Sequence, residues 1–229
     1  KITFINEMAD LCEKVGADVH DVARGIGLDG RIGRKFLHAG PGYGGSCFPK
    51  DTRALVGTAE RFGAPCRIVE TVVAVNDARK RQMAEKVVAA CGGSVKGCAI
   101  AVLGVTFKPN TDDMRESPSL DILPALQAAG ATIRAFDPEG MTEARKLLDN
   151  IQWCGDAYDA MTGADAVVIV TEWNQFRALS LERMRKLLKR PVMVDLRNIY
   201  LPSEMAAAGF DYHCIGRPYL PPAGSGPSA

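Results

Sequence analysis

Neither sign of charge dominates this sequence: 28 lysines and arginines stand against 27 aspartates and glutamates, a formal net charge of +1 over 229 residues. A polyanionic partner favours a basic surplus, so neither nucleic acid nor an anionic membrane surface is predicted. No apolar run reaches the roughly 18 residues of a membrane-spanning helix. Internal repeats are lacking as well. The apolar fraction, 47%, still suffices for a core, and the length fits one large domain or a helical piece plus an α/β domain.

Paired cysteine motifs are also missing. The seven cysteines are odd in number and scattered, and no C-x-x-C pair or histidine-rich tract accompanies them. We therefore expect no metal site, and we expect reduced thiols in a cytoplasmic protein. The cysteines are Cys12, Cys47, Cys66, Cys91, Cys98, Cys154 and Cys214.

The chain opens on Lys1 rather than on methionine, and a helical pattern starts at once. We expect no signal peptide, and we expect a fragment whose N-terminal part is missing.

The stretch from Gly40 to Asp51 is the most informative part of the chain. Four glycines within residues 40–45 allow positive φ and a close approach of bare backbone to a ligand. Cys47 follows, and Pro49 predicts that a helix begins just after it. A helix N-terminus and a nearby ammonium both favour the reactive thiolate. With a carboxylate close by at Asp51, the stretch predicts nucleophilic catalysis on a ligand bound against the glycines.

Plainer interpretations of this stretch stay open. A lone cysteine is usually a small buried hydrophobe, and a glycine run is usually a turn. Gly40, Gly42 and Gly45 also match G-x-G-x-x-G, but residues 34–38 before them are mixed and charged, whereas that fingerprint follows a β-strand. A dinucleotide site is therefore not predicted in this loop.

Helical patterns fill the first part of the chain. Apolar spacing predicts a helix ending at Gly16, a second one capped by Asp18 and ending at Gly27, and a third over 49–62. A long helix from Pro65 to Gly92-Gly93 is a candidate dimer or domain-spanning spine, or else is simply buried.

The pattern changes at Cys98, where a continuous apolar run up to Gly104 is typical of a buried parallel strand. Strands are also expected over 132–136, 166–170, 192–195 and 212–215, with a weaker one over 151–153. Helical patterns lie between them, over 120–129, 142–148, 158–161, 181–188 and 203–208. This alternation predicts a Rossmann-like parallel sheet with helices on both faces. We expect an α/β protein with a helical region at 1–93, a sheet domain at 94–217 and a disordered tail at 218–229.

Polar residues gather where the predicted strands end. Lys108 and Arg115 lie in the charged loop 107–117, the segment 171–173 follows the fourth strand, and Arg197 follows the fifth. Ligands bind at this edge of such sheets, so the three cations are candidates for an anion such as a phosphate; the alternative is a solvated charged loop. The second strand ends at Asp137, where ribose-binding acids sit in dinucleotide folds, but the first strand lacks G-x-G-x-x-G, which argues against a nicotinamide cofactor on this sheet.

Four motifs together resemble the UDP-glucose/GDP-mannose dehydrogenase family over nearly the whole chain. They are Gly-Gly-Ser-Cys-Phe-Pro-Lys-Asp (44–51), Phe-Lys-Pro-Asn-Thr-Asp-Asp-Met-Arg-Glu-Ser-Pro (107–118), Thr-Glu-Trp (171–173) and Asp-Leu-Arg-Asn (195–198), in the family's order. Phe48 and Thr-Glu-Trp favour the branch acting on UDP-glucose, with GDP-mannose as the close alternative.

The resemblance implies a chemistry. Family enzymes oxidise a sugar's primary alcohol to a carboxylate with two NAD⁺, so NAD is the implied cofactor. Cys47 would attack the aldehyde, and the thiohemiacetal would become a thioester that water hydrolyses. Asp51 would handle protons or position water.

Binding roles are implied in the same way. Arg31 would come from a neighbouring subunit, which implies a homodimer, and Lys108 and Arg197 would contact the UDP-sugar. Gly45, Lys50 and Arg115 would lie on the NAD side. The loop around the sugar nucleotide would include Phe36, Leu37, His38, Gly40, Gly42, Tyr43 and Gly44.

The chain departs from the family pattern at its start. The N-terminal Rossmann domain of the family and its Lys-x-x-x-Asn pair have no counterpart, because Lys1 and Asn6 come too late to be that pair. We expect the NAD domain to be the missing partner of this chain and the fragment to be inactive alone. The alternative is a dimerising, nucleotide-binding module without turnover.

Overall fold

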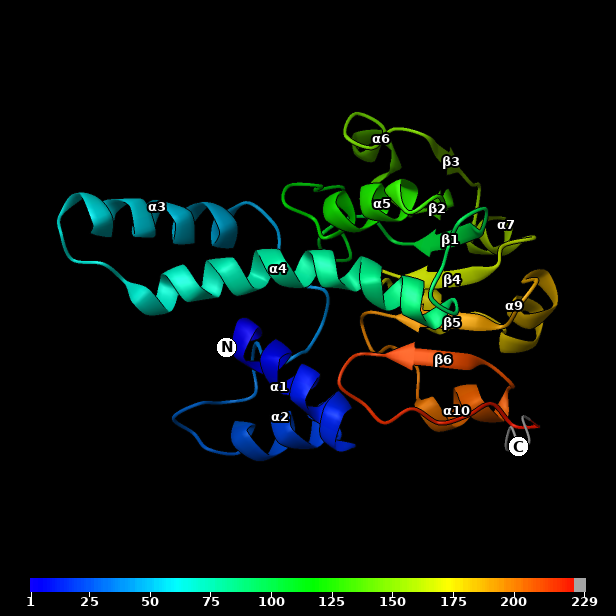
Figure 1. Cartoon of the computed structure of the whole chain (residues 1–229), viewed down its shortest axis with the longest axis horizontal. Coiled ribbons are helices and arrows are strands. Elements are labelled where there is room, and N and C mark those ends of the chain that lie inside the picture. The colour runs from blue at the N-terminus through cyan, green and yellow to red at the C-terminus, as the bar shows by residue number, and fades with distance from the viewer. Residues whose placement is uncertain (225–229) are drawn as a thin grey trace.

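The computed structural model describes residues 1–224, which contain four helices followed by a parallel sheet with its own helices. The first four helices are α1 (Ile2–Val15), α2 (Val19–Gly27), α3 (Cys47–Arg61) and α4 (Arg67–Ala90). Helix α3 and the first half of α4 lie side by side and project away from the sheet (Figure 1). The second half of α4 runs back over the sheet and leads into its first strand.

The sheet has six strands, all parallel, in the order β3-β2-β1-β4-β5-β6. The strands are β1 (Ala99–Leu103), β2 (Thr132–Phe136), β3 (Ile151–Trp153), β4 (Ala166–Ile169), β5 (Val192–Asp195) and β6 (Asp211–Cys214). The order reverses direction between β1 and β4, so the crevice for a ligand lies where these two strands end. The predicted α/β fold with a Rossmann-like parallel sheet is confirmed.

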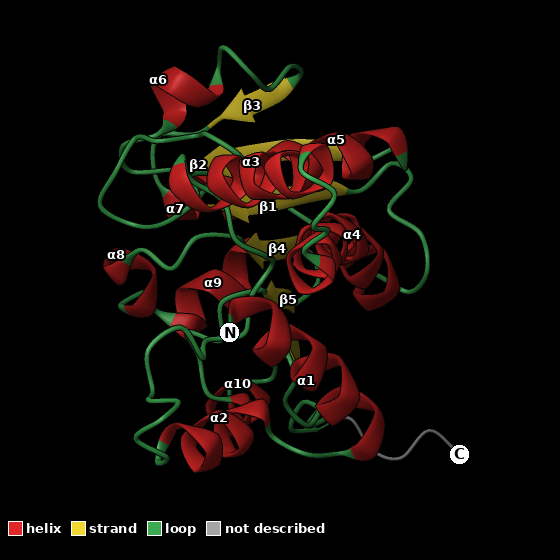
Figure 2. Cartoon of the chain, turned by 90° about the vertical axis from the view of Figure 1, so that its left-hand side faces the viewer, coloured by secondary structure: helices red, strands yellow, loops and turns green. Residues whose placement is uncertain are grey.

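Helices cover both faces of the sheet (Figure 2). Along β1, Ile100 and Val102 face one core, which α1, α2, α4 and α5 complete; Ala101 and Leu103 face the other, which α7, α9 and α10 complete. This alternation follows from the two-residue period of a strand. The helices that follow strands are α5 (Ser119–Ala128), α6 (Met141–Ala144), α7 (Ala157–Met161), α8 (Asn174–Arg177), α9 (Leu181–Leu187) and α10 (Pro202–Ala207).

The element boundaries differ from prediction at a few places. Helix α3 begins at Cys47 itself, with Pro49 as its third residue, because the first N–H groups of a helix have no partner within it and a proline costs nothing there. The long helix begins at Arg67 rather than at Pro65. The helix expected over 142–148 is a single turn, α6, and α8 was not predicted.

The tail differs as well. The Tyr219 ring stacks on His213, and the Ala223 amide donates to the Ala206 carbonyl at 2.8 Å. Residues 218–224 therefore lie against β6 and α10, contrary to the expected disorder. The rest of the predicted tail, 225–229, lies outside the described residues.

Candidate functional site

Cys47 is presented by the exposed first turn of α3. Ser46 is the N-cap but makes no capping hydrogen bond; its hydroxyl lies 3.6 Å from the Cys47 sulfur. Cys47 is the exposed one among the seven free cysteines. Its sulfur lies at the N-terminal end of a 15-residue helix, which is the positive end of the helix dipole. The interpretation of Cys47 as a small buried hydrophobe is therefore wrong.

The loop that follows β1 lies opposite the cysteine. A pocket of about 390 Å³ has Cys47 and the glycine loop on one side and Phe107, Lys108 and Arg115 on the other. The Arg115 guanidinium pairs with the Asp113 carboxylate at 2.8 Å, which holds the pKa of Asp113 below its usual range and raises that of Arg115. The pocket thus combines a thiol with two cations and the Asp113 carboxylate.

A second pocket of about 260 Å³ adjoins the first, and Gly44, Phe48, Phe107 and Lys108 line both. It brings together eight of the ten residues predicted to bind substrate. These are Phe36, His38, Gly40, Gly42, Tyr43, Gly44, Lys108 and Arg197. A ligand with an anionic part in one pocket and a reactive group in the other would therefore span from the sheet edge to Cys47.

Arg197 is fixed at the edge of the sheet. Its Nε donates to the Val170 carbonyl at 2.7 Å, its Nη2 donates to the Phe107 carbonyl at 3.2 Å, and the Glu172 carboxylate lies 3.0 Å away. The side chain is 15% exposed, and burial lowers the pKa of Arg197, although an arginine stays charged at neutral pH. Its Nη1 faces Gly40 of the glycine loop, so a fixed cation borders the second pocket.

Asp137, at the position of a ribose-binding acid, is fully buried and bonded within the protein. One carboxylate oxygen accepts from the Val105 and Thr106 amides and from the Trp173 indole; the other accepts from the Glu139 and Gly140 amides. With its acceptor sites occupied by the chain, this acid has none left for a ribose. The residues present on this sheet therefore do not fit a dinucleotide bound in the usual Rossmann manner, in agreement with the sequence analysis.

Four predicted site residues lie outside both pockets. The Asp51 and Lys50 side chains are exposed and pair with each other at 3.2 Å. Arg31 is also exposed and pairs with Asp29. The Leu37 side chain is in the core, 4% exposed, so that contact of Leu37 with a ligand would come from its main chain. Of the residues predicted on the NAD side, Gly45 and Arg115 line the cysteine pocket.

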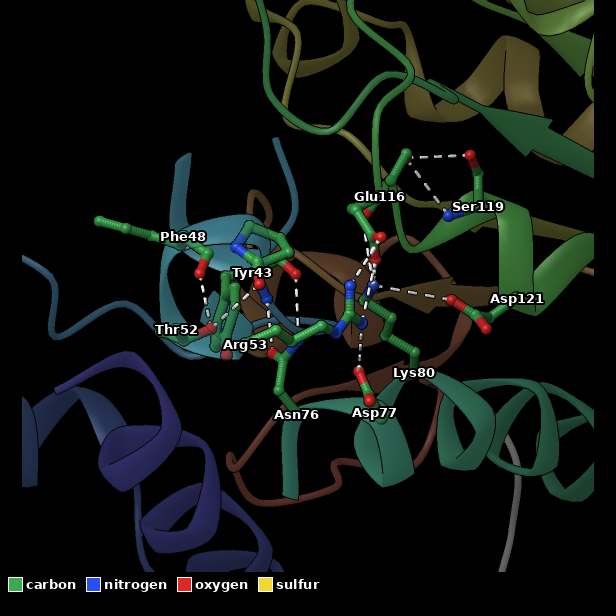
Figure 3. Close-up of polar contacts among 12 residues, drawn as sticks. Tyr43, Phe48, Thr52, Arg53, Asn76, Asp77, Lys80, Glu116, Ser119 and Asp121 are labelled. Atoms are coloured by element: carbon green, nitrogen blue, oxygen red, sulfur yellow. Dashed lines mark hydrogen bonds and ion pairs between the residues drawn. The ribbon is translucent and has the colours of Figure 1, made fainter. Parts of the chain in front are cut away.

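Buried polar side chains of α1 and α4 hold the glycine loop, and the sequence analysis missed them. The Asn76 amide oxygen accepts from the Tyr43 amide at 2.8 Å, and its nitrogen donates to the Tyr43 carbonyl (Figure 3). Asn6 accepts from the Gly40 amide at 2.9 Å, and Arg79 donates to the Gly40 carbonyl at 2.6 Å. A polar residue within an apolar helical stripe was the available signal for Asn76.

None of the helices in residues 1–224 has both the length and the hydropathy of a membrane-spanning segment.

The doubly wound sheet, with its crevice where β1 and β4 end, defines a fold of the nucleotide-binding class, and the exposed Cys47 thiol lines a pocket beside that edge of the sheet. Two family models match the chain: the central domain of the UDP-glucose/GDP-mannose dehydrogenase family over residues 1–78, and the UDP-binding domain of the same family over 101–202. The chain belongs to this family, as its motifs indicated.

Individual relatives agree with this assignment. The chain is 65% identical over 218 residues to a UDP-glucose 6-dehydrogenase of Rhizobium meliloti, with 95% of this chain and 50% of the relative covered. It is 49% identical to the UDP-glucose 6-dehydrogenase TuaD of Bacillus subtilis, with 95% and 47% covered. The chain thus spans about half the length of the curated relatives that it matches.

Solved structures show the same fold. A UDP-glucose dehydrogenase from Pyrobaculum islandicum superposes with a TM-score of 0.78 at 36% identity, covering 86% of this chain and 44% of that one. An NDP-N-acetyl-D-galactosaminuronic acid dehydrogenase from Methanosarcina mazei superposes with a TM-score of 0.84 at 29% identity, covering 95% and 48%.

Proposed function

We propose that this chain is the substrate side of an NAD-dependent UDP-glucose 6-dehydrogenase, which oxidises UDP-glucose to UDP-glucuronate. The observation that carries the proposal is the position of Cys47, exposed at a helix N-terminus in a pocket continuous with the one bordered by Arg197. The names of the relatives at 65% and 49% identity support UDP-glucose as the substrate. The complete protein would supply an N-terminal NAD domain, and the chain alone would be inactive.

The chain's own residues have defined tasks in this proposal. Lys108 and Arg197 would bind the diphosphate, and the glycine loop would approach the sugar with bare backbone. Once the C6 alcohol has become an aldehyde, the Cys47 sulfur adds to its carbon and the carbonyl oxygen takes up a proton, giving a thiohemiacetal. Oxidation of this adduct gives a thioester; water then attacks the carbonyl carbon, and the thiolate leaves. In both oxidations the hydride acceptor would be NAD⁺.

Asp51 and Lys50 lie outside both pockets but close to Cys47, within the first turns of α3. Asp51 would position the hydrolytic water or handle its proton, and Lys50, paired with it at 3.2 Å, would hold the carboxylate. Gly45, Lys50 and Arg115 would border the cofactor. Arg31 would reach the site of a second copy in a homodimer. The seven free thiols favour a cytoplasmic location.

Replacing the nucleophile tests the proposal. In the complete protein, Cys47→Ala should lower the rate of UDP-glucuronate formation by about 10³-fold or more, because Cys47 is the one thiol of residues 1–224 that lines either pocket. The measurement is acid formation by chromatography together with NADH absorbance. Cys66→Ala, at a thiol outside both pockets, is the matched control and should keep normal turnover. Normal acid formation by Cys47→Ala would disprove the covalent route.

GDP-mannose remains the alternative substrate. Base contacts decide between the two nucleotides, so a comparison of UDP-glucose with GDP-mannose as substrates separates them. Turnover of GDP-mannose alone would move the protein to that branch of the family.

A further inference from the structure

The cation loop, residues 107–117 with Lys108 and Arg115, belongs to the sheet domain, but its C-terminal end is held by the projecting helices α3 and α4. The Glu116 carboxylate accepts from Arg53 of α3, at 2.8 Å to one oxygen and 3.4 Å to the other. Lys80 of α4 donates to the Glu116 carbonyl at 3.1 Å, and its Nζ lies 3.5 Å from the carboxylate. Figure 3 shows these side chains converging on Glu116 from the two helices.

Lys80 is the buried member of this contact. Its side chain is 3% exposed, and within residues 1–224 its ion-pair partners are Glu116 and, at 3.8 Å, Asp121 of α5. A buried ammonium needs carboxylate partners, so Lys80 retains both groups beside it. Arg53 holds the pKa of Glu116 below its usual range, which keeps the carboxylate charged at neutral pH.

The main chain at Glu116 also contacts the glycine loop. Glu116 has a φ of +53°, a left-handed conformation that is unusual for a glutamate. Its carbonyl lies so close to Gly44 that a Cβ there would stand 2.3 Å from the oxygen, and the Gly45 amide donates to the Arg115 carbonyl at 2.8 Å. The glycine loop and the cation loop therefore touch backbone to backbone next to Cys47.

We propose that Arg53, Lys80 and Glu116 form an electrostatic clasp that holds the cation loop of the sheet domain against α3 and α4. The clasp thereby places the sugar of a bound nucleotide sugar at Cys47. These three are positioning residues, since none of them lines either pocket. The inference rests on the proposed function. In the proposed function Lys108 and Arg197, both of the sheet domain, would bind the diphosphate, so opening the clasp should spare nucleotide binding and separate the sugar from the thiol.

Protection of Cys47 measures this seating. Iodoacetamide modification of Cys47 is followed by peptide mass mapping, with UDP-glucose at ten times the dissociation constant that calorimetry gives for each variant. If the seated sugar covers the sulfur, this occupancy slows modification of the wild-type chain about tenfold. In Glu116→Gln, we expect UDP-glucose to bind within about threefold of wild-type affinity, while protection falls below about twofold.

A second variant changes the clasp residue of α3, Arg53. Arg53→Met should behave like Glu116→Gln, and Arg53→Lys, which keeps the charge, should restore most of the protection. Glu182→Gln removes a glutamate paired with Lys186 on α9, away from the site, and should match the wild-type chain. Circular dichroism at 222 nm, matched among variants, confirms that each is folded.

The outcomes separate the two proposals. Full protection in both Glu116→Gln and Arg53→Met would overturn the clasp, and so would loss of UDP-glucose binding in these variants, because the clasp would then build the nucleotide site itself. A wild-type chain that neither binds UDP-glucose nor shows protection would refute the proposed function, and the clasp with it.

Discussion

At the scale of single residues, the hydrogen bonds of Asp137 within the protein make this acid unavailable to a ribose. In a doubly wound fold, an acid near the end of the second strand ordinarily serves a ribose. Here its two oxygens organise the turns after β1 and β2 and bond the Trp173 indole. The carboxylate therefore fixes these two turns, while the cations that line the adjoining pocket are Lys108 and Arg197.

Asp137→Asn should therefore destabilise the fold. An amide would turn an NH₂ group toward buried N–H donors that now have an acceptor, and the free energy of unfolding should fall by about 3 kcal/mol. Urea titration followed by tryptophan fluorescence measures this. Asp112→Asn, at an exposed aspartate of the cation loop, is the control and should change stability by less than about 0.5 kcal/mol. Equal stability of the two variants would contradict the structural role of Asp137.

At the scale of elements, the contact between the glycine loop and the cation loop depends on a missing side chain. Gly44 faces the main chain of Glu116, and a Cβ would lie 2.3 Å from its oxygen and 2.9 Å from its carbonyl carbon. Main-chain atoms cannot swing aside as a flexible side chain can. Any larger residue at position 44 must push the two loops apart.

Gly44→Ala is expected to lower the free energy of unfolding by about 1–3 kcal/mol, as overpacking does. Gly57→Ala is the matched control: a Cβ at this position in α3 meets nothing within 4 Å, and the change should raise stability by up to about 1 kcal/mol. Thermal unfolding of the two variants gives the comparison. The same direction of change in both would mean that Gly44 is not in close contact.

The sequence predicts the helices and strands better than it predicts the contacts between them. Continuous apolar runs identify the buried strands. Gly16 marks the end of α1, and Asp18 and Gly27 mark the start and the end of α2. Helix α8 was missed because it is a single turn of four residues, too short for periodicity. The Arg53–Glu116 pair joins residues 63 positions apart, and no local pattern encodes such a partner.

The candidate site divides in the same way. Local spacing at helix and strand ends pointed to Cys47, Lys108 and Arg197 as candidates, and the structure places them in two adjoining pockets. Asn6 and Arg79, which hold Gly40, were not identified, since buried polar residues in helices resemble surface positions until their partners are known. The exposed positions of Asp51 and Lys50 likewise follow from the course of α3, which their spacing alone does not give.

At the scale of the whole molecule, the helical region and the sheet share one core. Ile5, Val19 and Val87 pack in the same cluster as Ile100 and Val102. At the far end of the sheet, the Gly216 amide donates to the Glu13 carboxylate at 2.8 Å, and the Val19 amide donates to the Gly216 carbonyl at 2.7 Å. The boundary proposed near residue 93 therefore separates two parts of one packed body.

The chain should consequently unfold in a single transition. Both tryptophans lie in the sheet domain, so their fluorescence reports that part, whereas circular dichroism at 222 nm reports mainly the long helices of residues 1–90. Coincident urea midpoints are expected from the two probes, because neither half can expose its side of the shared core alone. Midpoints separated by more than about 0.5 M would show that the halves unfold independently.

The burial of Lys80 also bears on recombination between relatives. Lys80 lies in the first half of the chain, and its carboxylate partners Glu116 and Asp121 lie in the second; Arg53 has Asp77 as a further partner in its own half. A chimera joined near residue 93 that receives a second half without acids at these two positions would inherit an ammonium with no counter-charge in its interior. A second half that is to replace the one in this chain must therefore bring acids at positions 116 and 121, so the crossover point constrains residues on both of its sides.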